Sequence, residues 1–205
     1  MNIENNPLKD HQLIDSSIGE LARGSIGLTV IALGLCGFVY SAAATGLGQV
    51  LFPDQANGSM IIENDQVLGS SLVAQPFVQA QYFHPRPSAS KYDPMTMAGS
   101  NMARTNPELN KIVDERLNHI AVQEQVEKSR IPADLVTASG SGIDPEISVQ
   151  SAMIQVKRIA NERHLSEPIV MKLVQEYTIQ PSFGLLGKAR VNVLELNLAL
   201  DQIGK

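Results

Sequence analysis

One uncharged stretch near the amino terminus constrains this chain more than any other feature. Between Gly24 and Pro53 there is no Lys, Arg, Asp or Glu, and the segment from Ile26 to Leu47 is apolar or small at nearly every position. A helix rises about 1.5 Å per residue, so about 20 such residues cross a hydrocarbon core of roughly 30 Å. The sequence has no second stretch of this kind. The chain is therefore predicted to cross a membrane once.

The positive charges around this span predict its direction. Lys9 and Arg23 precede it, and the next Lys or Arg after Arg23 is Arg86. Because Lys and Arg collect on the cytoplasmic side, the amino terminus is predicted to be cytoplasmic and the rest extracytoplasmic. The predicted division is a cytoplasmic tail at 1–24, a transmembrane helix at 25–48 and an extracytoplasmic domain at 49–205.

A cleaved signal peptide is the alternative interpretation of the same segment. Ala42, Ala43 and Ala44 follow an apolar run and have the small side chains of a cleavage site. However, apolar residues continue beyond them to Phe52, and the tail before the span is long and acidic. These features favour a permanent anchor over a secreted, soluble domain.

Composition excludes several classes of function. The net charge of −5 argues against nucleic acid as a partner. The one cysteine, Cys36, lies inside the apolar stretch, so neither a disulfide within the chain nor a Cys/His zinc site is expected. The chain has no Trp, and only 4% of its residues are aromatic, which argues against a stacking platform for bases or sugars.

The part of the chain after the span is predicted to be an α+β domain. Short apolar runs around Asn64-Asp65 are typical of a hairpin, and Asn106-Pro107 has the form of a helix start. Strands followed by helices favour one domain with a small sheet and about three to four helices. The predicted elements are a hairpin at 60–73, loops at 84–106, a helix at 107–129, a strand at 134–138, a loop at 139–142, helices after Ser148 and Ser166, and a last helix from Asn192 to Ile203.

Four blocks of this domain stand out by their literal sequence. They are 83–89 (FHPRPSA), 99–107 (GSNMARTNP), 134–148 (DLVTASGSGIDPEIS) and 190–201 (RVNVLELNLALD). With the single amino-terminal span, their order and spacing resemble the C subunit of the bacterial Kdp potassium-transporting ATPase. The resemblance covers about residues 25–203. His84 is a departure, because the family often has Gly there.

The resemblance implies an accessory subunit and no free-standing enzyme. The family works beside a channel-like potassium-binding subunit, a P-type ATPase catalytic subunit and a very small membrane peptide. Their complex uses ATP to bring potassium into the cell. The family's C subunit is thought to aid assembly and is described as raising the ATP affinity of the hydrolysing subunit, as a catalytic chaperone. ATP and potassium then belong to the complex, and no cofactor is expected on this chain.

The small-residue loop in the third block allows two interpretations. Its backbone N–H groups could wrap an anion, but no Lys or Arg follows until Lys157, so the P-loop pattern is absent. A tight turn is the favoured alternative, and an outer location would separate the loop from cellular ATP. The loop is retained as a candidate contact for a partner or a nucleotide through Ser139, Gly140, Ser141, Gly142 and Asp144.

An alternative class is a membrane-anchored extracytoplasmic hydrolase. Ser139 or Ser141 would be its nucleophile and His164 its base. The G-x-S-x-G spacing of a nucleophile elbow is absent around both serines, so no catalytic residue is predicted. Asp144, which precedes a proline, is more typical of a turn that its carboxylate fixes.

The remaining candidates concern protein partners. Arg86, between two prolines, is a candidate partner contact, with an ion pair inside its own domain as the equal alternative. Asn101 is a second candidate, in a tripeptide whose residues suit turn geometry. Gly27, Gly34 and Gly37 are expected to let a partner's membrane helix pack closely against the span. Without a charged residue in the span, a potassium path through this chain is not expected.

Overall fold

The structure is a computed structural model that describes residues 17–203 of the chain. It consists of two units, one ending at Asn57 and the other beginning at Gly58. Most of the predicted cytoplasmic tail, including Lys9, lies outside the described residues.

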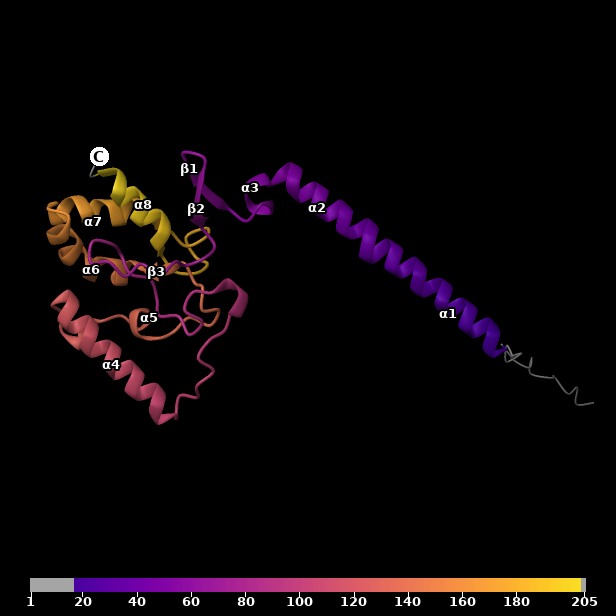
Figure 1. The fold of residues 1–205 in the computed structure, drawn as a ribbon, viewed down its shortest axis with the longest axis horizontal. Coiled ribbons are helices and arrows are strands. Elements are labelled where there is room, and N and C mark those ends of the chain that lie inside the picture. Colours follow the sequence, from indigo (N-terminus) through magenta and orange to yellow (C-terminus); the bar gives the residue numbers. More distant parts are fainter. Residues whose placement is uncertain (1–16, 204–205) are drawn as a thin grey trace, which may run out of the picture. The chain divides into compact units, whose positions relative to one another are not determined.

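The first unit is dominated by one long helix, labelled α1 and α2 in Figure 1. It runs from Ile18 to Leu51 and is long and apolar enough to cross a membrane. Ser17 starts it with a capping box, in which its hydroxyl accepts from the Glu20 N–H and the Glu20 carboxylate accepts from the Ser17 N–H. The helix therefore begins before the predicted span at 25–48, whose ends stay a prediction. Its segments are α1 (Ile18–Ala32), a π-helical stretch (Leu33–Val39) and α2 (Tyr40–Leu51), followed by the short α3 (Pro53–Ala56).

The π-helical stretch contains two of the three glycines that are predicted to pack against a partner's membrane helix. Gly34 and Gly37 both lie within Leu33–Val39, and a Cβ added to either, or to Gly27, would meet no atom within 4 Å. None of the residues of α1, the π-helical stretch or α2 is buried. A π-helical turn is wider than an α-helical one and is often found at functional positions.

The second unit opens with the predicted hairpin. Strand β1 (Met60–Glu63) pairs antiparallel with β2 (Gln66–Ser70), with a bulge between Ile61 and Ile62. Asn64 and Asp65 connect them with φ of 50° and 61°. Two consecutive left-handed residues form a type I′ turn, whose twist matches the strands that it joins. The hairpin is therefore confirmed, although its second strand ends before the predicted residue 73.

The first helix of this unit, α4 (Pro107–Glu124), starts where the sequence indicates and ends earlier. The Asn106 side chain accepts from the Glu108 N–H at 2.9 Å. Gln125 then adopts a left-handed conformation with φ of 55°, which ends the helix. The predicted continuation to Ser129 is wrong, and a short 3₁₀ turn (Lys128–Arg130) takes its place. Another 3₁₀ turn (Pro94–Thr96) lies in the predicted loop region before α4.

The strand predicted at 134–138 is wrong, because this segment forms the short helix α5 (Ala133–Val136). Pro132 stands at its N-cap position, and the Thr137 hydroxyl donates to the Ala133 carbonyl at 2.7 Å. Leu135 and Val136 are buried in a small cluster with Ile131 and apolar side chains of α4. The segment 134–138 is too short for its apolar residues to show a helical or a strand periodicity, and packing against α4 decides its conformation.

A second small sheet organises the rest of the domain, and the α+β class is confirmed. Strand β5 (Arg190–Asn192) lies between β3 (Glu146–Ser148) and β4 (Thr178–Ile179), and both pairings are antiparallel. In Figure 1 the helices α6, α7 and α8 are grouped together, and α4 lies on the side of α6 and α5 away from α8. These helices are α6 (Val149–Glu162), α7 (Glu167–Glu176) and α8 (Val193–Ile203).

The helix starts of this region follow the predicted caps. Ser148 accepts from the Ser151 N–H at 3.1 Å, and Asn192 accepts from the Leu194 and Glu195 N–H groups at 3.1 and 3.2 Å. Ser166 occupies the N-cap position of α7 without a side-chain hydrogen bond to the helix. Caps of this kind satisfy N–H groups that a helix start leaves unpaired.

The main core lies between α6, α7, α8 and the second sheet. Its largest fully buried side chains include Phe83, Ile159 and Leu196. Phe83 comes from a segment without regular structure, and Asn197 of α8 holds its backbone in place. The side-chain Oδ1 of Asn197 accepts from the Phe83 N–H at 2.8 Å, and the side-chain Nδ2 of Asn197 donates to the Phe83 carbonyl at 3.0 Å. This pair fixes the loop that leads to Arg86.

Candidate functional site

The loops of the four sequence blocks meet at one place in the domain. The Ser139 N–H donates to the Pro87 carbonyl at 3.1 Å, and the Ser88 hydroxyl donates to the Gly142 carbonyl at 2.6 Å. The third and fourth blocks join through the pairing of β3 with β5. We call this meeting point of the segments 85–90, 98–101, 139–148 and 187–192 the loop junction. It is the first candidate site.

Alternating charges line one face of the loop junction. Arg86 donates to Asp144 at 2.7 Å, and Arg190 donates to Glu146 at 2.8 Å. Asp144 also accepts from the Glu146 N–H at 3.1 Å, so the predicted turn-fixing role of this carboxylate is confirmed. A hollow of about 710 Å³ lies beside these groups, and we call it the charged hollow. Its charged lining residues are Arg86, Asp134, Asp144, Glu146, Lys188 and Arg190.

The structure therefore shows Arg86 in an ion pair within its own domain. About a quarter of the Arg86 side chain and 29% of the Asp144 side chain stay exposed, so the pair is accessible from outside. The Arg86 Nε is buried and has no hydrogen-bond partner among the residues that the structure describes. A contact of Arg86 with a partner subunit remains a prediction.

Asp134 holds the two sides of the charged hollow together. Its carboxylate accepts from the Ser148 N–H at 2.7 Å and from the Ser151 hydroxyl at 2.7 Å. This joins α5 to the start of α6. With a third hydrogen bond from the Ser148 hydroxyl at 3.2 Å, both carboxylate oxygens of Asp134 are engaged in this structural link.

The small residues of the third block are used for close packing between loops. Gly142 has φ of 77°, and a Cβ there would lie 2.7 Å from the Ala98 carbonyl oxygen. A Cβ on Gly99 would lie 3.1 Å from the Gly140 carbonyl oxygen. Both glycines thus let the 98–101 segment approach the 139–142 loop, and Gly140 itself has open space around it. Asn101 is exposed with φ of 53°, which agrees with the turn geometry expected there.

The two serines of the loop accept hydrogen bonds from their own turn. The buried Ser139 hydroxyl accepts from the Gly142 N–H at 2.8 Å, and the exposed Ser141 hydroxyl accepts from the Ile143 N–H at 3.2 Å. This is the tight turn that the sequence favoured. It leaves neither hydroxyl arranged as a nucleophile beside a base.

His164 lies at the other end of α6 from these serines. It follows the helix in a left-handed conformation with φ of 55° and is exposed. Asp134 ties the segment before Ser139 to the first turn of α6, and a helix of 14 residues is about 21 Å long. Within residues 17–203 no hydrogen bond joins either serine to His164. The structure therefore does not assemble the Ser/His pair of a hydrolase.

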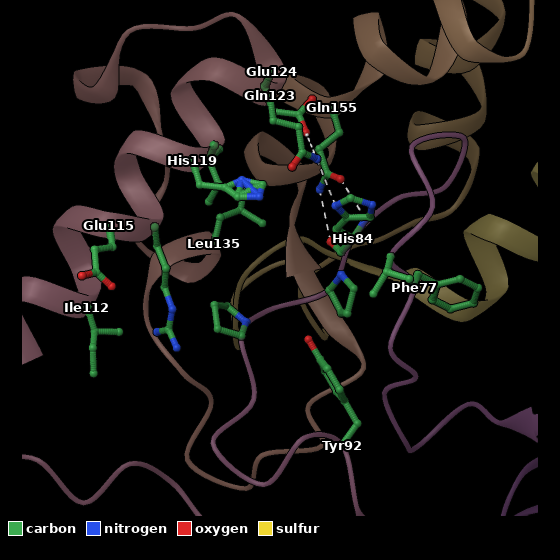
Figure 2. Close-up of a pocket in the computed structure, with 15 residues that line it drawn as sticks. Phe77, His84, Tyr92, Ile112, Glu115, His119, Gln123, Glu124, Leu135 and Gln155 are labelled. Carbon is green, nitrogen blue, oxygen red and sulfur yellow. Dashed lines mark hydrogen bonds between the residues drawn. The ribbon is translucent and has the colours of Figure 1, made fainter.

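A second hollow lies between α4 and the segment 77–92, with a volume of about 570 Å³ (Figure 2). We call it the α4 pocket. Figure 2 shows His84, Gln123, Glu124 and Gln155 gathered at one end of it, with His119 and Leu135 nearby. Gln123 donates to His84 Nδ1 at 3.1 Å, which leaves His84 Nε2 to donate to the Gln79 carbonyl at 3.1 Å. Burial, with a smaller contribution from Arg158, lowers the pKa of His84, in agreement with this neutral form.

A buried ion pair closes the same end of the α4 pocket. Arg158 of α6 donates to Glu124 of α4 at 2.8 Å, and the two side chains are only 8% and 3% exposed. Burial raises the pKa of Glu124, and Arg158 opposes this rise. Arg158 also donates to the carbonyls of Ala80 and Tyr82, the latter at 2.9 Å. The pair therefore fastens the 77–84 segment to two helices.

Sequence reasoning did not find this pair or the α4 pocket. Glu124 and Arg158 are 34 positions apart, and no local pattern connects them. His84 was visible only as a departure from the family pattern. Among the described residues no group of three or more His, Cys, Asp or Glu is arranged to hold a metal ion.

Comparisons with known proteins give one consistent result. A family model described as "KdpC: K+-transporting ATPase, c chain" matches residues 22–202. A "Potassium-transporting ATPase KdpC subunit" of Xanthomonas campestris is 49% identical over 182 residues, which cover 89% of this chain and 87% of the relative. The protein of the same name from Shewanella putrefaciens is 49% identical over 183 residues, covering 89% and 90%. That of Acidobacterium capsulatum is 48% identical, covering 88% and 97%.

Proposed function

Because the chain belongs to the KdpC family of potassium-transporting ATPase subunits, we propose that it stabilises the assembly of its transport complex from within the membrane. An accessory role in potassium uptake follows from the family itself. The proposed partners are the channel-like potassium-binding subunit, the P-type ATPase catalytic subunit and a small membrane peptide. The observation that carries the proposal is a long apolar helix with no buried residue.

The proposed mode of assembly is lateral packing of this helix in the bilayer. Gly27 and Gly34 are two turns apart and so share a face, and Gly37 lies three residues further along. Their open surroundings allow a neighbouring backbone to approach closely, which is how helices associate in lipid. The wide π-helical turns at Leu33–Val39 add to the surface that a neighbour can contact. The amino terminus is proposed to be cytoplasmic and the domain extracytoplasmic, at the inner membrane.

The loop junction is proposed as the contact between the domain and a partner subunit. Arg86 and Asn101 are the residues assigned to it, next to the partly exposed charges of Asp144 and Glu146. A surface with both signs of charge suits a polar loop that carries complementary charges. Such a contact favours correct orientation more than raw affinity.

Any effect of this chain on ATP affinity is proposed to be indirect. In the proposed orientation the domain and cellular ATP lie on opposite sides of the membrane. The small residues of the 139–142 loop pack against the 98–101 segment, and the loop contains no lysine that could bind a phosphate. A change in ATP affinity would then pass through the helix and the subunits that it contacts.

Co-purification tests the proposal. Membranes containing the full chain and an affinity-tagged catalytic subunit are solubilised in mild detergent, and the amount of this chain retained is measured. The wild type is expected to co-elute. The double variant Gly34→Leu/Gly37→Leu is expected to reduce the retained amount about tenfold, equivalent to about 1.4 kcal/mol of association.

Ala32→Leu is the matched control, because it adds the same side chain on another face of the same helix. It is expected to co-elute like the wild type. An intact wild-type chain that never associates with the transport subunits would refute the proposal. If the double variant and the control behave alike, the assigned packing face is wrong.

A further inference from the structure

Three exposed apolar side chains of the domain lie close together on one tight turn between β4 and β5. Phe183 is 93% exposed, Leu185 86% and Leu186 64%. We call the segment 182–187 the apolar turn. Large apolar side chains gathered on one small surface mark a contact with another apolar phase.

The apolar turn is rigid. Ser182 and Leu186 exchange two backbone hydrogen bonds of 2.9 Å, and the Leu185 N–H donates to the Ser182 carbonyl at 3.2 Å. Phe183 and Gly184 have φ of 54° and 72°, the two left-handed positions of a type I′ turn. The side chains are therefore presented in one arrangement, so little conformational entropy is lost when they make a contact.

Phe183 makes this arrangement costly for the isolated domain. A bulky residue in the left-handed region is strained, and glycine or asparagine would be the ordinary choice at its position. Burial does not offset the strain, because the phenyl ring is almost fully exposed. Because no packing within the domain compensates for the backbone strain at Phe183, we expect this side chain to act in a contact outside the domain.

We propose that the apolar turn inserts into the interfacial layer of the same bilayer that holds the long helix. Helix α2 ends at Leu51 and the domain begins at Gly58, and the segment 52–57 spans at most about 20 Å. The tether therefore keeps the domain close to lipid, so even a weak membrane contact is populated. This inference rests only on the long helix being membrane-spanning.

The chemistry of the apolar turn suits lipid. Backbone hydrogen bonds satisfy the N–H groups of Ser182, Gly184, Leu185 and Leu186, which lowers the cost of placing this turn next to an apolar phase. The exposed Lys188 follows directly and can place its ammonium group among the headgroups. Phenylalanine and leucine beside a lysine are typical of interfacial membrane contacts.

Tryptophan fluorescence tests the insertion in the full chain. The sequence contains no Trp, so Phe183→Trp introduces the only indole. The variant chain is reconstituted alone into vesicles of phosphatidylcholine and phosphatidylglycerol, with and without brominated acyl chains. Bromine quenches only indoles that reach the acyl region. The emission of Phe183→Trp is expected to fall about threefold in the brominated vesicles, as for a side chain at interfacial depth. Val122→Trp, which replaces an 81% exposed residue of α4, is the control and is expected to lose little emission.

A second variant pair separates insertion from a defect in folding. Leu185→Trp is expected to be quenched like Phe183→Trp, and adding Phe183→Asp should abolish that quenching. The thermal midpoint should not fall, because the phenyl ring is almost fully exposed and aspartate tolerates a left-handed φ better than phenylalanine does. Equal quenching of Phe183→Trp and Val122→Trp would overturn the proposal. A blue-shifted emission without bromine quenching would also overturn it, since protein and not lipid would then cover the turn. These vesicles contain no partner subunit, so either result leaves the co-purification test unaffected.

Discussion

Removing Arg158 should destabilise the domain by several kilocalories per mole. In Arg158→Met, Glu124 keeps a carboxylate that is 3% exposed and loses its cation. The carbonyls of Ala80 and Tyr82 lose their donor at the same time. Breaking a buried ion pair from one side costs about 3–5 kcal/mol, out of a total stability of about 5–15 kcal/mol for a domain. Each kcal/mol lowers the midpoint by about 2–4 °C at this size, so a fall of about 10 °C is expected.

The assay is thermal unfolding of the full chain in detergent, followed by circular dichroism. Lys172→Met is the matched control, because Lys172 pairs with Glu176 at 3.5 Å with both side chains more than half exposed. A surface pair of this kind contributes about 0–1 kcal/mol. The double variant Glu124→Leu/Arg158→Met should regain much of the loss, since no buried charge then remains unpaired.

The pH dependence gives an independent check on the cause. Burial raises the pKa of Glu124 above its unfolded value, and Arg158 holds it down. At pH values between the unfolded and the folded pKa of Glu124, only the folded wild-type protein holds the proton. The contribution of Glu124 to the stability of the wild type therefore falls as the pH rises through this range. Without Arg158 the pKa of Glu124 rises further, and protonation then relieves the buried charge. The deficit of Arg158→Met should therefore be smaller at pH 5 than at pH 8. A loss no larger than that of Lys172→Met, or a larger deficit at pH 5, would refute this reasoning.

Two further predictions concern the loop junction and its side of the membrane. Gly142→Ala should lower the free energy of unfolding by about 2–3 kcal/mol, because it combines a left-handed φ with a Cβ 2.7 Å from the Ala98 carbonyl oxygen. Gly140→Ala is the control and should change the thermal midpoint little, because the space around Gly140 is open. Equal midpoints for the two variants would contradict the packing role of Gly142. In a Cys36→Ser background, Asp144→Cys in intact cells should react with a membrane-impermeant maleimide without lysis; labelling only after lysis would reverse the proposed orientation.

Local signals in the sequence were enough for some elements. Asn64-Asp65 predicted the hairpin because two left-handed residues form the turn that twisted strands need. Asn106-Pro107 predicted the start of α4 because the cap and the fixed proline φ act within one turn. The charge-free stretch predicted the long helix because crossing lipid is a matter of length and composition.

Other elements depend on contacts that the sequence does not display. Strands β3, β4 and β5 are two or three residues long, which is too short for alternation to appear. The apolar run at Leu135-Val136 is helical because α4 covers it, and its own composition would also suit a strand. The loop junction was recognisable as literal blocks, but their meeting requires hydrogen bonds between residues more than 50 positions apart.

The hydrogen bonds of the 80–84 segment explain how a loop with little regular structure can present Arg86 in one position. The backbone of Phe83 is held by Asn197, the N–H of His84 donates to Gln155 at 2.8 Å, and Arg158 binds the carbonyl just before Phe83. Helices of the core thus fix the segment immediately before Arg86, whose own charge is then placed by Asp144. A contact surface that is already ordered loses little entropy on docking, so more of its interaction energy remains for binding. The polar side chains of Asn197, Gln155 and Arg158 therefore hold this loop in the position that the contact proposed at the loop junction requires.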